Sequence, residues 1–163
     1  MTPADLIAAG QTLYGPVWQS TLARALRNSK GAPLSDRTVR LWIEGKRKIS
    51  PWADEQILRL LVDRQVQRIE DVLASLSVKG AGTFLFATYA SDDDLRLCTG
   101  EGWTTAFHSK MITGIVELLR ERGVESRAIP ISAAAYLKWL GSRPNTAAER
   151  SAFAALRAQV STY

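Results

Sequence analysis

The first third of the chain carries apolar residues at helical spacing in three short segments. Thr2 precedes the first segment and Ser35 begins the third, and both residue types favour the N-cap of a helix, where the side-chain oxygen accepts a hydrogen bond from the first turn. Glycine residues follow the first and third segments, which is typical of helix ends. The predicted helices cover residues 3–13, 17–27 and 35–45. We therefore expect residues 1–50 to form a small helical domain.

Pro51 begins a longer segment in which helical spacing continues to about residue 77. One face of this predicted helix is apolar, with members three or four residues apart on an otherwise charged helix. The members of this apolar stripe are Leu58, Val62, Val66, Ile69, Leu73 and Leu76. At a rise of about 1.5 Å per residue the helix would be roughly 40 Å long. We expect residues 51–78 to connect the N-terminal domain to the rest of the chain and to carry a dimerisation face.

The pattern changes after Lys79-Gly80-Ala81-Gly82, a composition typical of a linker. Residues 83–89 are β-branched and aromatic and predict a strand, and residues 124–131 predict a second one. Predicted helices cover residues 104–122, 132–140 and 145–160. The order β-α-β-α-α implies two parallel strands joined by a right-handed crossover. The sequence thus predicts a mainly α (α+β) protein whose residues 83–163 form a small C-terminal domain for dimerisation or for binding a partner.

Charge is concentrated in one part of the chain. The 163 residues carry a net charge of +5, and the 25 residues from Arg24 to Lys48 alone carry eight basic and two acidic side chains. The net charge of that segment is +6, so the net charge of the remaining residues is about −1. Such clustering is typical of a surface that binds a polyanion.

Composition excludes several classes of function. No apolar stretch reaches the roughly 18 residues that a membrane-spanning helix needs. The first thirteen residues lack a basic leader and contain Asp5, so we expect a cytoplasmic protein without a secretory signal. Cys98 and His108 are the single cysteine and the single histidine, which excludes an internal disulfide and leaves little for a metal centre. We predict no metal, no cofactor and no enzymatic activity.

Three weaker candidates have plainer explanations. Asp92, Asp93 and Asp94 could ligate a divalent cation, but such a run often only solvates a loop or caps a helix. His108 is followed by Ser109 and Lys110, and three consecutive residues of one helix cannot converge on a substrate. Cys98 has no second histidine to activate it, so the sequence favours a small buried residue over a nucleophile.

Two of the short helices share a recognisable spacing of residues. The pattern is Gln19-x-x-Leu22-Ala23-x-x-Leu26, then Ser35-x-x-Thr38-Val39-x-x-Trp42-x-x-Gly45, then Ile49-x-Pro51. Over about residues 17–51 this resembles the helix-turn-helix of phage and bacterial repressors of the Cro and lambda-repressor type. The resemblance implies that Leu22, Ala23, Leu26, Val39 and Trp42 form a small core. Eight residues, 27–34, stand where such motifs usually have two, and we expect Leu34 to take the core position of the turn.

The resemblance also implies which residues meet DNA. Residues at the start of the second helix, the loop and the basic run after the third helix would bind phosphate; these are Gln19, Ser20, Lys30, Lys46, Arg47 and Lys48. Residues at the start of the third helix would face the bases in the major groove; these are Asp36, Arg37, Thr38 and Arg40. Arg37 is the first choice for base reading, because a guanidinium can pair bidentately with guanine.

The implied function is a sequence-specific transcriptional regulator that binds double-stranded DNA. By resemblance, it would be a homodimeric repressor on an inverted-repeat operator, of phage or mobile-element origin. It could be an autorepressor such as those that accompany anti-CRISPR or toxin–antitoxin genes. We expect pairing through the long helix and the edges of the two-stranded sheet, unless the stripe packs on its own C-terminal domain.

Two alternatives remain from the sequence. The C-terminal domain could bind a small molecule or a second protein, which would make the chain a sensor or an inhibitor of the anti-CRISPR or antitoxin kind. An enzyme acting on nucleic acid is the other alternative, but no convergent set of Asp, Glu and His supports it.

Overall fold

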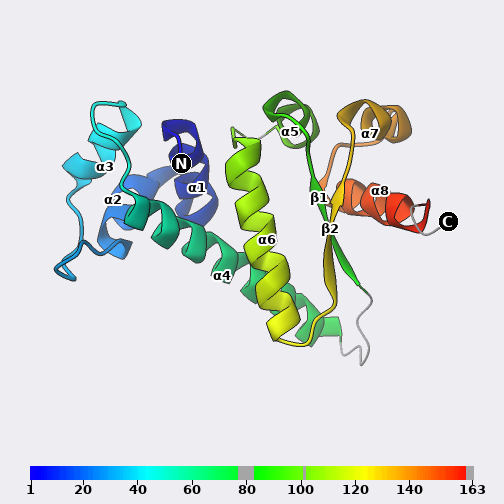
Figure 1. The fold of residues 1–163 in the computed structure, drawn as a ribbon, viewed down its shortest axis with the longest axis horizontal. Helices are drawn as coiled ribbons and strands as arrows, with labels where there is room; N and C mark the ends of the chain where they lie inside the picture. Colours follow the sequence, from blue (N-terminus) through cyan, green and yellow to red (C-terminus); the bar gives the residue numbers. More distant parts are fainter. Residues whose placement is uncertain (77–82, 101, 161–163) are drawn as a thin grey trace. The chain divides into compact units, whose positions relative to one another are not determined.

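The computed structural model describes residues 1–76, 83–100 and 102–160 and is mainly helical, with a small two-stranded parallel sheet. The chain divides into two compact units, Met1–Arg64 and Gln65–Tyr163. The first unit contains α1 (Pro3–Tyr14), a 3₁₀ turn (Gly15–Val17), α2 (Trp18–Ala25) and α3 (Asp36–Ile43) (Figure 1). The second contains β1 (Phe84–Thr88), α5 (Asp92–Thr99), α6 (Thr105–Glu121), β2 (Ser126–Pro130), α7 (Ala133–Leu140) and α8 (Ala147–Val160). The long helix α4 (Pro51–Leu76) belongs to both, because the boundary between the units lies inside it.

The helices of the first unit begin where the sequence predicts. Thr2 caps α1 through its hydroxyl, which accepts from the Asp5 N–H at 3.2 Å, while Asp5 Oδ2 accepts from the Thr2 N–H at 2.8 Å. Ser35 caps α3 by accepting from the Thr38 N–H. The second helix is shorter than predicted and ends at Ala25, because Leu26 has an extended backbone with ψ 143°.

The predicted core of the first unit is confirmed. Leu22, Ala23, Leu26, Val39 and Trp42 are all buried, together with Leu6, Ala9 and Leu13 of α1. Helix α1 comes so close to the Trp18 ring that a Cβ at Gly10 would lie 2.0 Å from it. Glycine in the middle of a helix costs about 1 kcal/mol relative to alanine, and here it makes room for an indole ring.

Helix α4 contributes a different line of residues to this core than the stripe predicts. Ala53, Ile57 and Leu61 are buried at successive turns, whereas Leu58 is only half-buried. The stripe repeats every three or four residues and this line every four, and the two lie next to each other on the helix. Spacing alone therefore does not decide which of two adjacent apolar rows faces the core.

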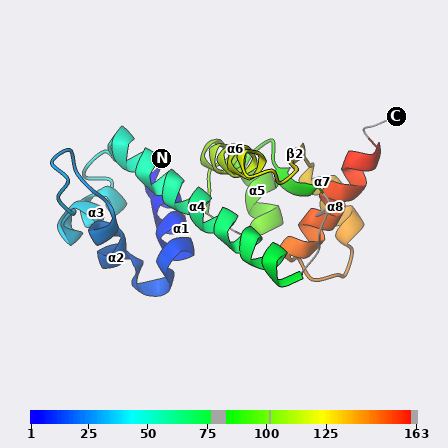
Figure 2. The ribbon, with the colours of Figure 1, turned by 90° about the horizontal axis from the view of Figure 1, so that it is seen from below.

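The sheet of the second unit is parallel, as predicted, with Phe84 opposite Ser126 and Thr88 opposite Pro130. Helices α6 and α8 both contact the two strands. The strands lie between these helices in Figure 1, and Figure 2 shows the same order from below. Ser126 is fully buried, and its hydroxyl donates to the Val116 carbonyl of α6 at 3.0 Å.

One prediction for the second unit is wrong. The predicted order β-α-β-α-α lacks a helix: residues 92–94 form the first turn of α5, so the order is β-α-α-β-α-α. Ser91 caps this helix by accepting from the Asp94 N–H at 3.1 Å, and carboxylates are favoured in a first turn. Asp92 Oδ1 also accepts from the N–H and the hydroxyl of Thr105, both at 2.7 Å, and these bonds lower the pKa of Asp92.

Some predicted features lie outside the described residues: Ser77, the predicted end of the long helix, and the linker Lys79-Gly80-Ala81-Gly82. The side chain of Leu76 also lies outside them. Within the described ranges, no helix has the length and apolar character needed to cross a membrane.

Candidate nucleic-acid interface

Helix α3 has one buried side and one exposed cationic side. Val39 and Trp42 are almost fully buried, whereas Arg37 and Arg40 are exposed. With about 100° per residue, Arg37 lies nearly opposite Val39 and Trp42. Arg40 lies next to Arg37, on the exposed side of the helix. The packing of α3 therefore fixes which of its residues can reach a partner.

The other two predicted base-reading residues of α3 are bound to neighbouring side chains. Asp36 Oδ2 accepts a hydrogen bond from the Ser20 hydroxyl at 2.6 Å. The Thr38 hydroxyl lies 3.1 Å from that of Ser35, and Thr38 is half-buried. These two hydrogen bonds fix the start of α3, and one of them joins it to α2.

The eight-residue connection between α2 and α3 is a closed, hydrogen-bonded turn. The Asn28 side chain accepts from the N–H groups of Lys30 and Ala32, at 2.9 and 3.1 Å. Gly31 has a φ of +74°, which favours glycine at this position. Lys30 is thereby held at the exposed tip of the turn.

Both ends of this connection are tied to the helices. Gln56 of α4 binds the backbone of Arg27 in both directions, accepting at 3.0 Å and donating at 2.9 Å. At the other end the Leu34 N–H donates to the Ala23 carbonyl at 3.0 Å, and the Leu34 side chain is half-buried. The inserted residues thus lengthen the turn without separating the two helices.

The basic run after α3 is exposed, but its members differ. Lys46 Nζ lies 2.8 Å from Glu44 Oε2. The pKa of Glu44 is lowered, first by the hydrogen bond from Lys46 and then by its charge. Arg47 and Lys48 are exposed and have no such partner among the described residues.

Five cations of the basic segment have side chains without a hydrogen bond or ion pair to any described residue. They are Lys30, Arg37, Arg40, Arg47 and Lys48. In contrast, Arg24 and Arg27 turn back to backbone carbonyls of α2: Arg24 to Ser20 at 3.2 Å, and Arg27 to Arg24 and Leu26. The five unpaired cations are therefore the part of the +6 segment that is available to a polyanion.

A hollow of about 410 Å³ lies beside α3 in the same unit. Its walls come from the turn, from α3 and from the residues that lead into α4, and they include Asn28, Ser35 and Trp52. Arg47 is the one charged side chain among the described lining residues. Several polar groups of this lining are already engaged: Asn28 Oδ1 accepts from the turn, and the Ser35 and Thr38 hydroxyls bond to each other.

Of the remaining predicted site residues, Gln19 is exposed in the first turn of α2. The stripe is not a continuous exposed face, because Val62 and Val66 are 8% and 0% exposed in the single chain. Leu58, Ile69 and Leu73 are half-buried. Among the described side chains of the stripe, a dimer interface along α4 would therefore use these three and not Val62 or Val66.

Two residues that shape this site were missed in the sequence. Asn28 could have been found, because an asparagine three residues before a glycine indicates a turn that its side chain stabilises. Gln56 carries no such signal, since its partner is 29 positions away.

Comparison with known proteins adds nothing to this interface: no protein-family model matches the chain, and none of the curated proteins compared with the chain matches either.

Proposed function

We propose that the first unit binds double-stranded DNA and that the protein is a sequence-specific transcriptional regulator. One observation carries the proposal: a capped helix, α3, buries Val39 and Trp42 and presents Arg37 and Arg40, within a basic segment that holds five cations unpaired with any described residue. Such a helix, anchored on one side and basic on the other, suits insertion into the major groove.

The two arginines and the other cations take different roles in this proposal. Arg37 and Arg40 read base edges, since a guanidinium can donate two parallel hydrogen bonds to guanine. Lys30, Arg47 and Lys48 lie at the tip of the turn and after α3, and they contact phosphates, which set register and supply affinity without sequence information. Gln19, at the start of α2, adds a phosphate contact.

A regulator with one such helix reads few base pairs, so we propose a homodimer on an inverted repeat with half-sites about 34 Å apart. The half-buried Leu58, Ile69 and Leu73 of α4 are candidates for the dimer contact. The free edges of the two-stranded sheet are another candidate. The role would be repression, including that of its own promoter, in a phage or mobile element.

Selection from a random library of double-stranded DNA with the full chain tests the proposal. Fluorescence anisotropy then compares a selected duplex with a scrambled one over a range of salt concentrations. We expect binding that weakens steeply with salt on both duplexes and is tighter on the selected one.

Arg37→Ala should lose about 1–3 kcal/mol, roughly 5- to 150-fold, on the selected duplex and little on the scrambled one. Arg127→Ala is the matched control, since Arg127 is an exposed arginine of the second unit. Equal losses on both duplexes would reassign Arg37 to a phosphate contact. Absence of any enriched, salt-sensitive DNA would overturn the proposed function.

A further inference from the structure

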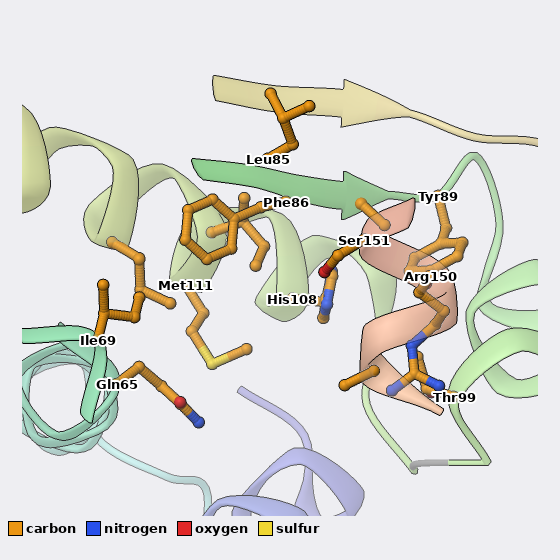
Figure 3. Close-up of a pocket in the computed structure, with 14 residues that line it drawn as sticks. Gln65, Ile69, Leu85, Phe86, Tyr89, Thr99, His108, Met111, Arg150 and Ser151 are labelled. Carbon is orange, nitrogen blue, oxygen red and sulfur yellow. The ribbon is translucent and has the colours of Figure 1, made fainter. Parts of the chain in front are cut away.

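The second unit contains a cavity of about 220 Å³ that the proposed DNA-binding role does not use. It is lined by β1, by α6, by the first turn of α8 and by Gln65 and Ile69 of α4. Figure 3 shows Ile69 and Gln65 on one side of it, and Tyr89, Thr99 and Arg150 on the other. Side chains from distant parts of the sequence thus surround one space.

The cavity lies at the edge of β1 that faces away from β2. The Phe84 N–H donates to the Glu125 carbonyl, and the Thr88 carbonyl accepts from Ile131, so these residues point toward β2. Backbone groups alternate along a strand, so those of Leu85 and Ala87, which line the cavity, point the other way. In the described part of the chain, no third strand pairs with this edge.

Arg150 supplies the positive charge of the cavity. Its Nη1 donates to the Cys98 carbonyl and to Asn145 Oδ1, both at 3.1 Å. Asn145 is held in turn by the Tyr136 hydroxyl, which donates to the same Oδ1 at 2.8 Å. No described carboxylate forms an ion pair with Arg150, and no described lining residue is acidic. The guanidinium is thus fixed in position while its charge is left uncompensated by those residues.

His108 adds a neutral hydrogen-bonding group. It is 7% exposed, and its ring lies 5.6 Å from that of Tyr89. Burial, and next the charge of Arg150, lower its pKa to about 4. A neutral imidazole has one N–H donor and one acceptor nitrogen, so at pH 7 His108 can donate to an anion without adding a second charge.

Apolar side chains form much of the remaining wall, which also includes the polar side chains of Gln65, Thr99 and Ser151. Phe86 comes from β1, Ile69 from α4, and Met111, Ile112 and Ile115 from α6. A mainly apolar space with a small number of polar groups is the usual form of a small-molecule site. A volume of about 220 Å³ lies below the roughly 300–1,000 Å³ of drug-sized sites, so the space suits a small metabolite and not a nucleotide.

We propose that this cavity binds a small monocarboxylate with an aromatic or branched apolar body. The carboxylate pairs with Arg150 and accepts a hydrogen bond from His108, and the body packs on Ile69, Phe86 and Met111. A single cation balances one negative charge; a phosphate dianion would leave a second charge uncompensated in a cavity that holds no other cation among its described lining residues, which is costly. The inference does not depend on DNA binding by the first unit, so either can fail without the other.

Calorimetric titration of the full chain tests this inference. The probes are isovalerate and phenylacetate, with isovaleramide and phenylacetamide as uncharged counterparts of the same shape. We expect saturable binding of at least one acid, at least tenfold tighter than that of its amide, and no saturable binding of inorganic phosphate. No binding of either acid up to 10 mM, or equal binding of acid and amide, would overturn the proposal.

Variants locate the site. Arg150→Gln should weaken binding of the acid at least tenfold, while Arg127→Gln, an exposed arginine outside the cavity, should leave it within twofold. Because Arg150 also binds Cys98 and Asn145, its loss could unfold the unit. Ile69→Trp, which keeps Arg150 and fills the cavity from its half-buried wall, is therefore measured beside it. Unchanged affinity in a folded Ile69→Trp protein would place the acid elsewhere and overturn the assignment.

Discussion

The Ser20 hydroxyl donates a hydrogen bond to Asp36 Oδ2 at 2.6 Å and joins the first turn of α2 to the first turn of α3. Both residues were predicted to meet DNA. The structure brings them together, with the carboxylate beside the exposed cations of α3. Asp36 therefore orients the helix and also places a negative charge where phosphates would approach.

Asp36→Ala should have opposite effects on stability and on DNA binding. Loss of the bond to Ser20 and of an acidic first-turn residue should lower the free energy of unfolding by about 1 kcal/mol. Loss of the negative charge should strengthen binding to scrambled DNA. Urea denaturation and anisotropy measure the two effects. Weaker binding to scrambled DNA in the folded variant would show that Asp36 contributes more by orienting α3 than by repelling phosphate.

The basic run after α3 should divide into unequal parts. Replacing Arg47 and Lys48 together by Gln should reduce the slope of log affinity against log salt by about two, because each removes one phosphate contact. Lys46→Gln should change it less, since Lys46 is already paired with Glu44. Anisotropy from about 50 to 200 mM salt measures this. A reduction of about one for Lys46→Gln, half that of the double replacement, would mean that the pair with Glu44 opens on binding.

Gly10→Ala should destabilise the first unit although alanine is the better helix former. The helix gains about 1 kcal/mol from the substitution. The new methyl group, however, would lie 2.0 Å from the Trp18 ring, and overpacking of this kind costs typically 1–3 kcal/mol or more. Gly102→Ala is the control, since nothing lies within 4 Å of its Cβ position. Equal urea midpoints for the two variants would contradict the tight packing of α1 on Trp18.

His108 should make stability depend on pH. Its folded pKa of about 4 lies below the ordinary value of 6.5, so the unfolded state binds the proton more readily. The part of the free energy of unfolding that depends on neutral His108 is fully present above about pH 6.5 and is lost as the pH falls to 4. This loss amounts to at most about 3 kcal/mol. The comparison is with His108→Gln by urea denaturation at several pH values. Parallel profiles for the two proteins would show that His108 is not buried as a neutral group.

The dimer should depend on the half-buried members of the stripe. Light scattering of the full chain at tens of micromolar should give a dimer, and Leu73→Glu should weaken it, because a charge there would be desolvated on association. Glu55→Lys, an exposed change of charge on the same helix, is the control. A monomeric wild-type chain at this concentration would contradict the prediction.

The sequence predicted most of the fold because its signals are local. Ser35 caps a helix, and Val39 and Trp42 repeat at helical spacing, so the presence of α3 and its buried side followed from neighbours a few positions apart. Helix α5 was missed because three consecutive aspartates suggest a loop, whereas here they satisfy the first turn of a helix and the N–H of Thr105.

The candidate sites were predictable to different degrees. The exposed cations of α3 follow from the same periodicity that places its core, so Arg37 and Arg40 could be named in advance. Whether Lys46 is paired, or Ser20 bound to Asp36, depends on side-chain directions that spacing does not contain. The cavity of the second unit could not be foreseen, because Ile69, His108 and Arg150 come from three elements far apart in the chain.

The boundary between the two units lies within α4, after Arg64, so the protein cannot be rearranged by cutting it at a loop. Each N–H of a helix donates to the carbonyl four residues earlier, so about four backbone hydrogen bonds of α4 cross this boundary. A cut there would leave the last carbonyls of one piece and the first N–H groups of the other without helical partners. Each unit would therefore keep its own part of α4 intact only if it were isolated with about one further turn of the helix.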